Sequence, residues 1–251
     1  MVKRKELVAY TNQLLQIDRF RDYAPNGLQV EGRDEIRVLA SAVTASYAVL
    51  EEAAAMGADA LLVHHGYFWQ GEDVAVVGMK RRRLAMLLGH HINLLGYHLP
   101  LDAHGVFGNN VQLARVLGIQ VQGSFGPEPG IALLGELSSP TEGAELARRI
   151  AIALGREPLH VAAQDARPIR RIGWCTGAAQ KYIEAAAESG LDAYLSGEAS
   201  EQTFHAAREM NIHFFAAGHH ATERYGVIAL SEHLAEKFLL QHRSIEIANP
   251  I

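Results

Sequence analysis

The sequence contains one cysteine, little proline and no long apolar run. Cys175 is the single cysteine among 251 residues, which excludes an internal disulfide framework and a cluster of thiolate metal ligands. No apolar stretch approaches the ~20 residues that span a bilayer, so a membrane protein is not expected. The first ten residues, MVKRKELVAY, are basic but lack the apolar core of a signal peptide, and we therefore expect a cytoplasmic protein.

Signatures of phosphate and nucleic-acid binding are also missing. Neither GxxxxGK[ST] nor GxGxxG occurs, so the sequence offers no P-loop and no dinucleotide-binding turn. A net charge of −5 disfavours a nonspecific DNA-binding surface. The one basic run, Lys80 to Arg83, is typical of a solvated helix face, and a grip on a substrate phosphate is the minority interpretation. Histidine, in contrast, is abundant, with 13 residues.

Strand-like and helix-like segments alternate along the chain. Apolar stretches of strand length occur at 37–44, 58–63 and 92–97, and helical patterns occur at 6–17, 46–56 and 80–88. Strands that are apolar throughout need cover on both faces. The pattern therefore predicts an α/β fold with mostly parallel sheets.

The pattern returns later in the chain. Residues 189–195 (SGLDAYL) match residues 56–62 (MGADALL) at an offset of 133 positions, which is 189 minus 56. We infer two related α/β lobes, residues 1–125 and 166–251, joined by a different segment, residues 126–165. The alternative, that any two strand–helix units look alike, stays open at this point.

Histidines and carboxylates follow three of the predicted strands. Open α/β sheets bind their ligands at the carboxyl ends of the strands, so these side chains are candidates for one site. The candidates are His64, His65, Asp102, His219 and Glu223. His219 and Glu223 are four residues apart and can face the same point from the first turn of a helix.

These five side chains together favour a metal centre. A lone His–His pair is more often part of the core or the surface. Here, however, histidines or carboxylates follow the ends of three predicted strands. Imidazole and carboxylate ligands suit Zn²⁺, Fe, Mn²⁺ or Ni²⁺. Five ligands exceed the needs of one catalytic ion and suit two ions with a bridging carboxylate and a water. Two ions ~3.5–4 Å apart lower the pKa of a shared water toward neutral and produce hydroxide for hydrolysis.

Three further residues are candidates for proton transfer or for orienting the ligands. His98 and His104 flank Asp102 and could hold it or move a proton. Glu198 occupies the position equivalent to His65 in the repeat, which suggests a general base or an orienting residue. The alternative for Glu198 is a role in the cap of the following helix.

Five motifs together resemble the YbgI/Nif-three-like family, whose bacterial members are often called GTP cyclohydrolase I type 2 homologues. The motifs are YAPNGLQV (23–30), VHHG (63–66), HLPLD (98–102), SGE (196–198) and GHHATE (218–223). The resemblance covers essentially the whole chain. It implies two metal ions in a cleft between two α/β lobes, and subunits assembled into a toroidal homohexamer, a trimer of dimers. It places the family's ligands on His64, His65, Asp102, His219 and Glu223.

The resemblance also implies a function. Some members of the family are reported to open the purine ring of GTP, and we therefore expect a metal-dependent hydrolase with a nucleotide as its substrate. The alternative is a non-catalytic protein that binds or handles metal, or a ring-shaped interaction scaffold. A ring that threads DNA is disfavoured by the acidic balance of the chain. We expect no membrane partner.

Overall fold

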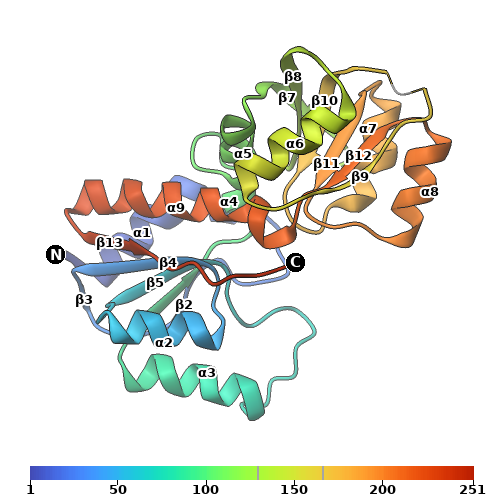
Figure 1. Ribbon diagram of the computed structural model, residues 1–251. Helices are drawn as coiled ribbons and strands as arrows, with labels where there is room; N and C mark the ends of the chain where they lie inside the picture. Colours follow the sequence, from blue (N-terminus) through green and yellow to red (C-terminus); the bar gives the residue numbers. More distant parts are fainter. Residues whose placement is uncertain (129, 166) are drawn as a thin grey trace. The chain divides into compact units, whose positions relative to one another are not determined.

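The computed structural model describes residues 1–128, 130–165 and 167–251, and the chain divides into two compact units (Figure 1). Unit 1 comprises Met1–Leu101 and Val227–Ala248, and unit 2 comprises Asp102–Gly226 and Asn249–Ile251. Each unit has its own sheet with helices packed against it, which confirms the α/β fold expected from the sequence. No helix within the described residues is both long and apolar enough to span a membrane.

The main sheet of unit 1 has five strands in the order β13-β4-β5-β6-β2. Their bounds are Gly27–Val30 (β2), Val38–Thr44 (β4), Ala60–His65 (β5), Asn93–Gly96 (β6) and Gln241–Ser244 (β13). Four strands run parallel, and β2 joins one edge antiparallel. A separate two-stranded ribbon pairs β1 (Val2–Lys3) with β3 (Glu35–Ile36).

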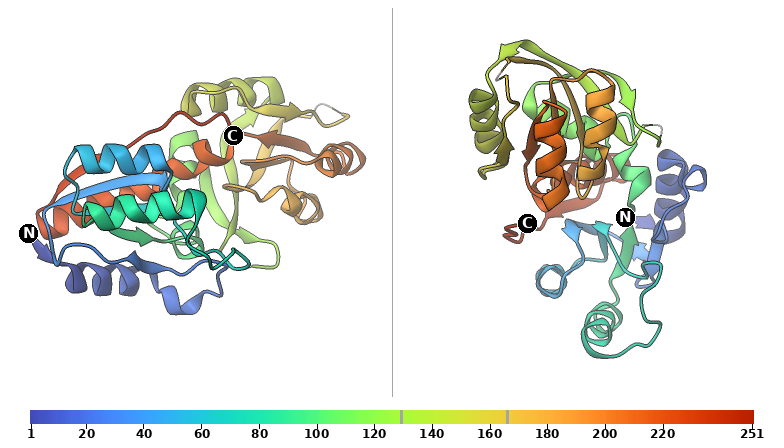
Figure 2. Two further views of the ribbon diagram at one scale, coloured as in Figure 1. Left: turned by 90° about the horizontal axis from the view of Figure 1, so that it is seen from below. Right: turned by 90° about the vertical axis from the view of Figure 1, so that its right-hand side faces the viewer.

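Helices cover both faces of this sheet (Figures 1 and 2). Helices α2 (Tyr47–Ala55) and α3 (Gly78–Gly89) lie on one face, and α1 (Arg4–Leu15) and the unit 1 part of α9 (His219–Phe238) lie on the other. A 3₁₀ turn, η1 (Ile17–Arg19), follows α1. Because both faces are covered, β4, β5 and β6 are buried along nearly their whole length, as their unbroken apolar sequence predicts.

The sheet of unit 2 has six strands in the order β7-β8-β10-β11-β12-β9. Their bounds are Gln120–Phe125 (β7), Ala132–Thr141 (β8), Leu159–Val161 (β9), Ile169–Cys175 (β10), Ala193–Ser196 (β11) and His213–Ala216 (β12). The central strands β10, β11 and β12 are parallel, and the outer pairs are antiparallel. The parallel pairing predicted from the sequence thus dominates unit 1 and the centre of unit 2.

The helices of unit 2 pack against this mixed sheet. Their bounds are Leu99–Asp102 (α4, which begins in unit 1), Asn109–Leu117 (α5), Gly143–Leu154 (α6), Gln180–Tyr182 (η2, a 3₁₀ turn), Ile183–Glu188 (α7) and Glu201–Glu209 (α8). Apolar residues of α5 and α6 share one buried cluster with Ile172, Trp174 and Phe215 of the sheet. This cluster is the core of unit 2.

The same pattern of side-chain-to-backbone hydrogen bonds occurs in both sheets. Oδ2 of Asp59 accepts hydrogen bonds from the backbone N–H groups of Arg37 and the following residue, at 2.9 and 3.0 Å. Oδ2 of Asp192 accepts hydrogen bonds from Arg170 and the following residue, at 3.0 and 2.8 Å. Both 192 minus 59 and 170 minus 37 equal 133, the offset found in the sequence. The repeat therefore extends from residue types to individual contacts.

The unit boundaries differ from those that the sequence predicted. The segment 126–165, expected to be a connector, supplies β8, α6 and β9 to unit 2. Residue 166, the expected start of the second lobe, lies outside the described residues. Strand β13, expected in the second lobe, pairs with β4 in unit 1. Pairings between segments this distant depend on tertiary structure and leave no local periodicity in the sequence.

Candidate metal centre

Three imidazoles meet in unit 1. His64 and His65 end strand β5 instead of following it, and their ring centroids are 4.6 Å apart. The ring of His98 lies 5.0 Å from that of His64 and 5.9 Å from that of His65. One nitrogen from each of the three side chains lies within 4.8 Å of the other two. These spacings allow a single cation to contact more than one imidazole.

Each of these rings uses Nδ1 for a contact within the protein. Nδ1 of His64 lies 2.9 Å from the carbonyl oxygen of Tyr97, and Nδ1 of His65 lies 3.0 Å from Oγ1 of Thr44. A carbonyl oxygen only accepts, so Nδ1 of His64 carries a proton and Nε2 carries the lone pair of the neutral ring. Metal-binding histidines are commonly oriented in this way through the nitrogen that does not bind the metal.

The ring of His98 is held by Asp22, a residue that the sequence analysis did not single out. Nδ1 of His98 donates to Oδ1 of Asp22 at 2.8 Å, and the side chain of Asn26 and the backbone of Leu99 donate to Oδ2 at 2.9 Å. Burial acts to raise the pKa of Asp22, but His98 and the other donors outweigh it and lower the pKa to about 2. Asp22 is the first residue of the segment 22–27 (DYAPNG). Its polar, proline and glycine residues predict a turn, but they do not indicate that Asp22 contacts His98.

In unit 2, a buried carboxylate ends helix α4. Oδ1 of Asp102 accepts hydrogen bonds from Nδ2 of Asn109 at 2.8 Å and from Oγ1 of Thr176 at 3.4 Å. A carboxylate oxygen of Asp102 lies within 4.8 Å of one of Glu223. Two carboxylates at this separation repel one another, and a bound cation would offset that repulsion.

The first turn of helix α9 carries the other two predicted ligands. Nε2 of His219 lies 3.1 Å from Oε2 of Glu223, and its Nδ1 lies 2.6 Å from Oε1 of Glu198. Burial by itself lowers the pKa of His219, but the carboxylates of Glu223 and Glu198 outweigh it and raise the pKa to about 9. Glycine is required opposite this pair, because a Cβ at Gly177 (φ +68°) would overlap Oε1 of Glu223.

The remaining candidates lie as follows. Glu198 orients the ring of His219 through Nδ1, and the cap of helix α8 is made by Ser200 and Thr203. Nδ1 of His104 accepts hydrogen bonds from the backbone N–H groups of Val106 and Phe107, at 3.2 and 3.0 Å. His104 therefore stabilises the turn before helix α5.

The donors present in the two units fit divalent metal ions. All of them are imidazole nitrogens or carboxylate oxygens, and the Nδ1 atoms of His64, His65 and His219 contact protein oxygens. Cys175 is buried in β10, and burial together with the carboxylates of Asp102 and Glu223 raises the pKa of its thiol. Without a bound cation, this thiol is therefore less readily deprotonated than an exposed cysteine.

A comparison with known families agrees with this reading of the fold. A profile of the Duf34/NIF3 (NGG1p interacting factor 3) family matches residues 2–250. The chain therefore belongs to the DUF34/NIF3 family.

Individual relatives match over nearly their full length. A Pseudomonas aeruginosa protein named "GTP cyclohydrolase 1 type 2 homolog" is 56% identical over 248 residues, which cover 97% of each chain. A solved structure described as protein ybgI, of unknown function, has a TM-score of 0.96 at 51% identity and covers 100% of both chains. A structure from Thermus thermophilus has a TM-score of 0.87 at 32% identity, again over 100% of both chains.

Proposed function

We propose that this protein is a metal-dependent hydrolase that holds two divalent ions with His64, His65, Asp102, His219 and Glu223. The observation that carries the proposal is the uniform orientation of the imidazoles. Nδ1 of each histidine in this set contacts a protein oxygen, which leaves Nε2 as the nitrogen that would bind a metal. At His219, Nε2 faces Oε2 of Glu223, and a bound metal ion would take the place of the proton between them.

The proposed ligand set draws on both units. Its support is the geometry within each unit and the connectivity of the chain. Asp102 directly follows Leu101, the last residue of the first segment of unit 1, within one short helix. Glu223 and Val227, at the other boundary, belong to the same helix α9. Both carboxylates therefore lie within four residues of unit 1 along the chain.

The chain's own residues have distinct tasks in this proposal. Bound divalent ions would supply Lewis-acid activation of a water and of the substrate. Glu198 orients His219, and Asn109 and Thr176 hold the carboxylate of Asp102. His98, fixed by Asp22, presents Nε2 as a group that can donate or accept a proton. The name shared by the bacterial relatives makes GTP the first substrate to test.

The test combines metal analysis with an activity assay. Elemental analysis of the protein as isolated should give about two metal equivalents per chain, as a dinuclear centre requires. The protein loaded with Mn²⁺, Fe²⁺ or Zn²⁺ is then assayed with GTP and with phosphodiesters. Glu223→Gln should abolish turnover, and Glu201→Gln, an exposed glutamate in the next helix along the chain from Glu198, should not. Tight metal binding without turnover of any substrate would favour the non-catalytic alternative.

Self-association into a homohexamer stays a prediction. It follows from the family resemblance, and light scattering coupled to size-exclusion chromatography would test it. A mass near six times 27.4 kDa would support the assembly, and a monomer would contradict it.

A further inference from the structure

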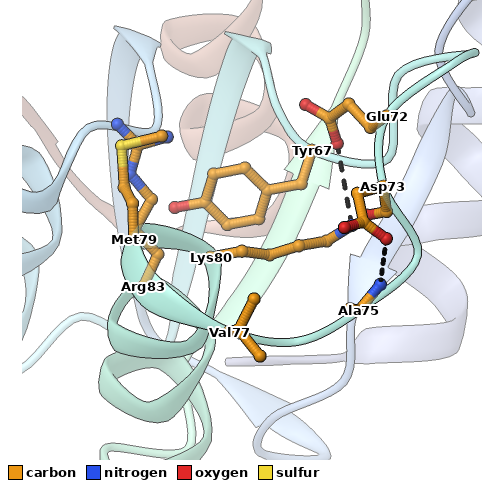
Figure 3. A pocket seen from close by; sticks show the side chains of 8 residues that line it. All are labelled: Tyr67, Glu72, Asp73, Ala75, Val77, Met79, Lys80 and Arg83. Atoms are coloured by element: carbon orange, nitrogen blue, oxygen red, sulfur yellow. Dashed lines mark hydrogen bonds and ion pairs between the residues drawn. The ribbon is translucent and has the colours of Figure 1, made fainter.

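A cavity of about 290 Å³ lies in unit 1 between helix α3 and the loop that precedes it (Figure 3). Its walls are mostly apolar: the ring of Tyr67, the side chains of Val77 and Met79, and the aliphatic stem of Lys80. Arg83 lies at one end, beside Met79, and the two acidic residues Glu72 and Asp73 lie at the other (Figure 3). Its volume is at the lower limit for small-molecule sites, which suits a ligand smaller than a nucleotide.

Some charged groups of the cavity have partners of opposite charge or hydrogen-bond partners, and others do not. Nζ of Lys80 lies 3.9 Å from Oε2 of Glu72 and donates to the carbonyl oxygen of Asp73 at 2.7 Å. Oδ1 of Asp73 accepts a hydrogen bond from the backbone N–H of Ala75 at 3.0 Å. Lys80 and Glu72 therefore offset each other, and the loop is fastened to the helix by the same contacts.

Arg83 has no such compensation. Its guanidinium lies 5.8 Å from the centroid of the Tyr67 ring, and its buried Nε makes no hydrogen bond within the described residues. No carboxylate of the described residues forms an ion pair with it. Arg83 lines the cavity, so its guanidinium offers an uncompensated positive charge to an anion bound there.

The start of helix α3 adds to this preference. The helix begins at Gly78 with no side-chain cap and no acidic residue in its first turn. Its first N–H groups therefore give the region a partial positive charge. A single negative charge fits these features better than two, because Glu72 and Asp73 would repel a second one.

We propose that this cavity binds a small carboxylic acid, with the carboxylate on Arg83 and an apolar body between Tyr67 and Val77. The basic run at residues 80–83 is thus only partly a solvated face. Lys80 and Arg83 line the cavity, and Arg81 and Arg82 are exposed. The proposal is independent of the metal centre and of any hydrolytic activity.

The experiment compares four probes by calorimetry or ligand-observed NMR on the full-length protein. The probes are 3-phenylpropionate, its neutral amide, acetate and phenyl phosphate. We expect saturable binding of 3-phenylpropionate that is at least about tenfold tighter than that of the other three, since only this acid combines one charge with an apolar body. Equal binding of the amide would overturn the proposal, as would the absence of saturable binding.

A pair of variants locates the site. Arg83→Gln should weaken 3-phenylpropionate binding by about tenfold or more, because it removes the charge-assisted contact. Arg82→Gln, an equivalent change at an exposed neighbour that does not line the cavity, should leave affinity within about twofold. Thermal melting of both variants controls for folding, and the comparison of the acid with its amide needs no variant. Equal losses in the two variants would contradict the assignment.

Discussion

Glu198 accepts a hydrogen bond from Nδ1 of His219 at 2.6 Å, and the two residues come from different strand–loop segments of unit 2. The contact fixes the plane of the imidazole and directs Nε2 toward Glu223. Among the candidate residues, Glu198 is thus an orienting group whose effect is exerted through His219.

Removal of this contact should weaken metal binding. Glu198→Ala should lower the affinity for a divalent ion by about 10–100-fold, because His219 loses the group that sets its orientation. Glu198→Gln retains an acceptor oxygen and should lose less. Competition with a chelating indicator measures the affinity. Glu201→Ala, at an exposed position paired with His205, is the control and should match the wild type.

Asp22 should control both the stability of unit 1 and the state of His98. Its side chain is 3% exposed, and its carboxylate accepts hydrogen bonds from His98, Asn26 and Leu99. Asp22→Asn should lower the free energy of unfolding by about 2–4 kcal/mol, because it replaces an acceptor with a group that also donates. Urea titration measures this. ¹⁵N NMR of His98 should show loss of the fixed Nδ1–H form, and Asp18→Asn, at an exposed site, should leave both readouts unchanged.

The space beside Glu223 should tolerate no methyl group. Gly177→Ala would place Cβ against Oε1 of Glu223 and 3.2 Å from Nε2 of His219, so the pair must shift and metal affinity should fall by at least about tenfold. Gly155 has a similar φ of +72° and nothing within 4 Å of an added Cβ. Gly155→Ala should therefore cost about 1 kcal/mol of stability without changing metal affinity. Equal metal affinities in the two variants would show that the steric argument is wrong.

A histidine pair in unit 2 should make the protein less stable in acid. Nε2 of His160 lies 3.1 Å from Nδ1 of His213, and Nε2 of His213 lies 3.1 Å from the carbonyl oxygen of Arg167. Burial, and then the neighbouring His213, lower the pKa of His160 below the ordinary 6.5. His160 therefore binds a proton more readily in the unfolded chain than in the folded protein. Its contribution to the free energy of unfolding is complete above pH 6.5 and is lost as the pH falls below that value.

The measurement is the urea midpoint at a series of pH values from 8 to 5. His160→Gln should reduce the loss of stability between pH 7 and pH 5.5, since it removes the group that takes up the proton. His90→Gln, at an exposed position, should leave the pH dependence as in the wild type. If His160→Gln left the pH dependence of the urea midpoint unchanged, His160 would not be the source of the loss of stability in acid.

Local sequence patterns determined much of the fold. The unbroken apolar stretches at 37–44 and 58–63 predicted β4 and β5 within a few residues, since a strand covered on both faces needs apolar residues throughout. The offset of 133 positions predicted the repeat that Asp59 and Asp192 mark in the two sheets. The residue types also restricted the candidate ligands to imidazoles and carboxylates, because a single cysteine leaves no thiolate set.

Tertiary structure alone decided which groups orient those candidates and where each unit ends. Asp22 lies 76 positions from His98, and β13 pairs with a strand that begins at Val38. Hydrogen bonds between segments so far apart arise only when the sheet assembles, and they impose no period on the neighbouring residues. The chemical type of each candidate residue can be taken directly from the sequence. The contacts that fix its side chain in one orientation depend on packing between distant segments.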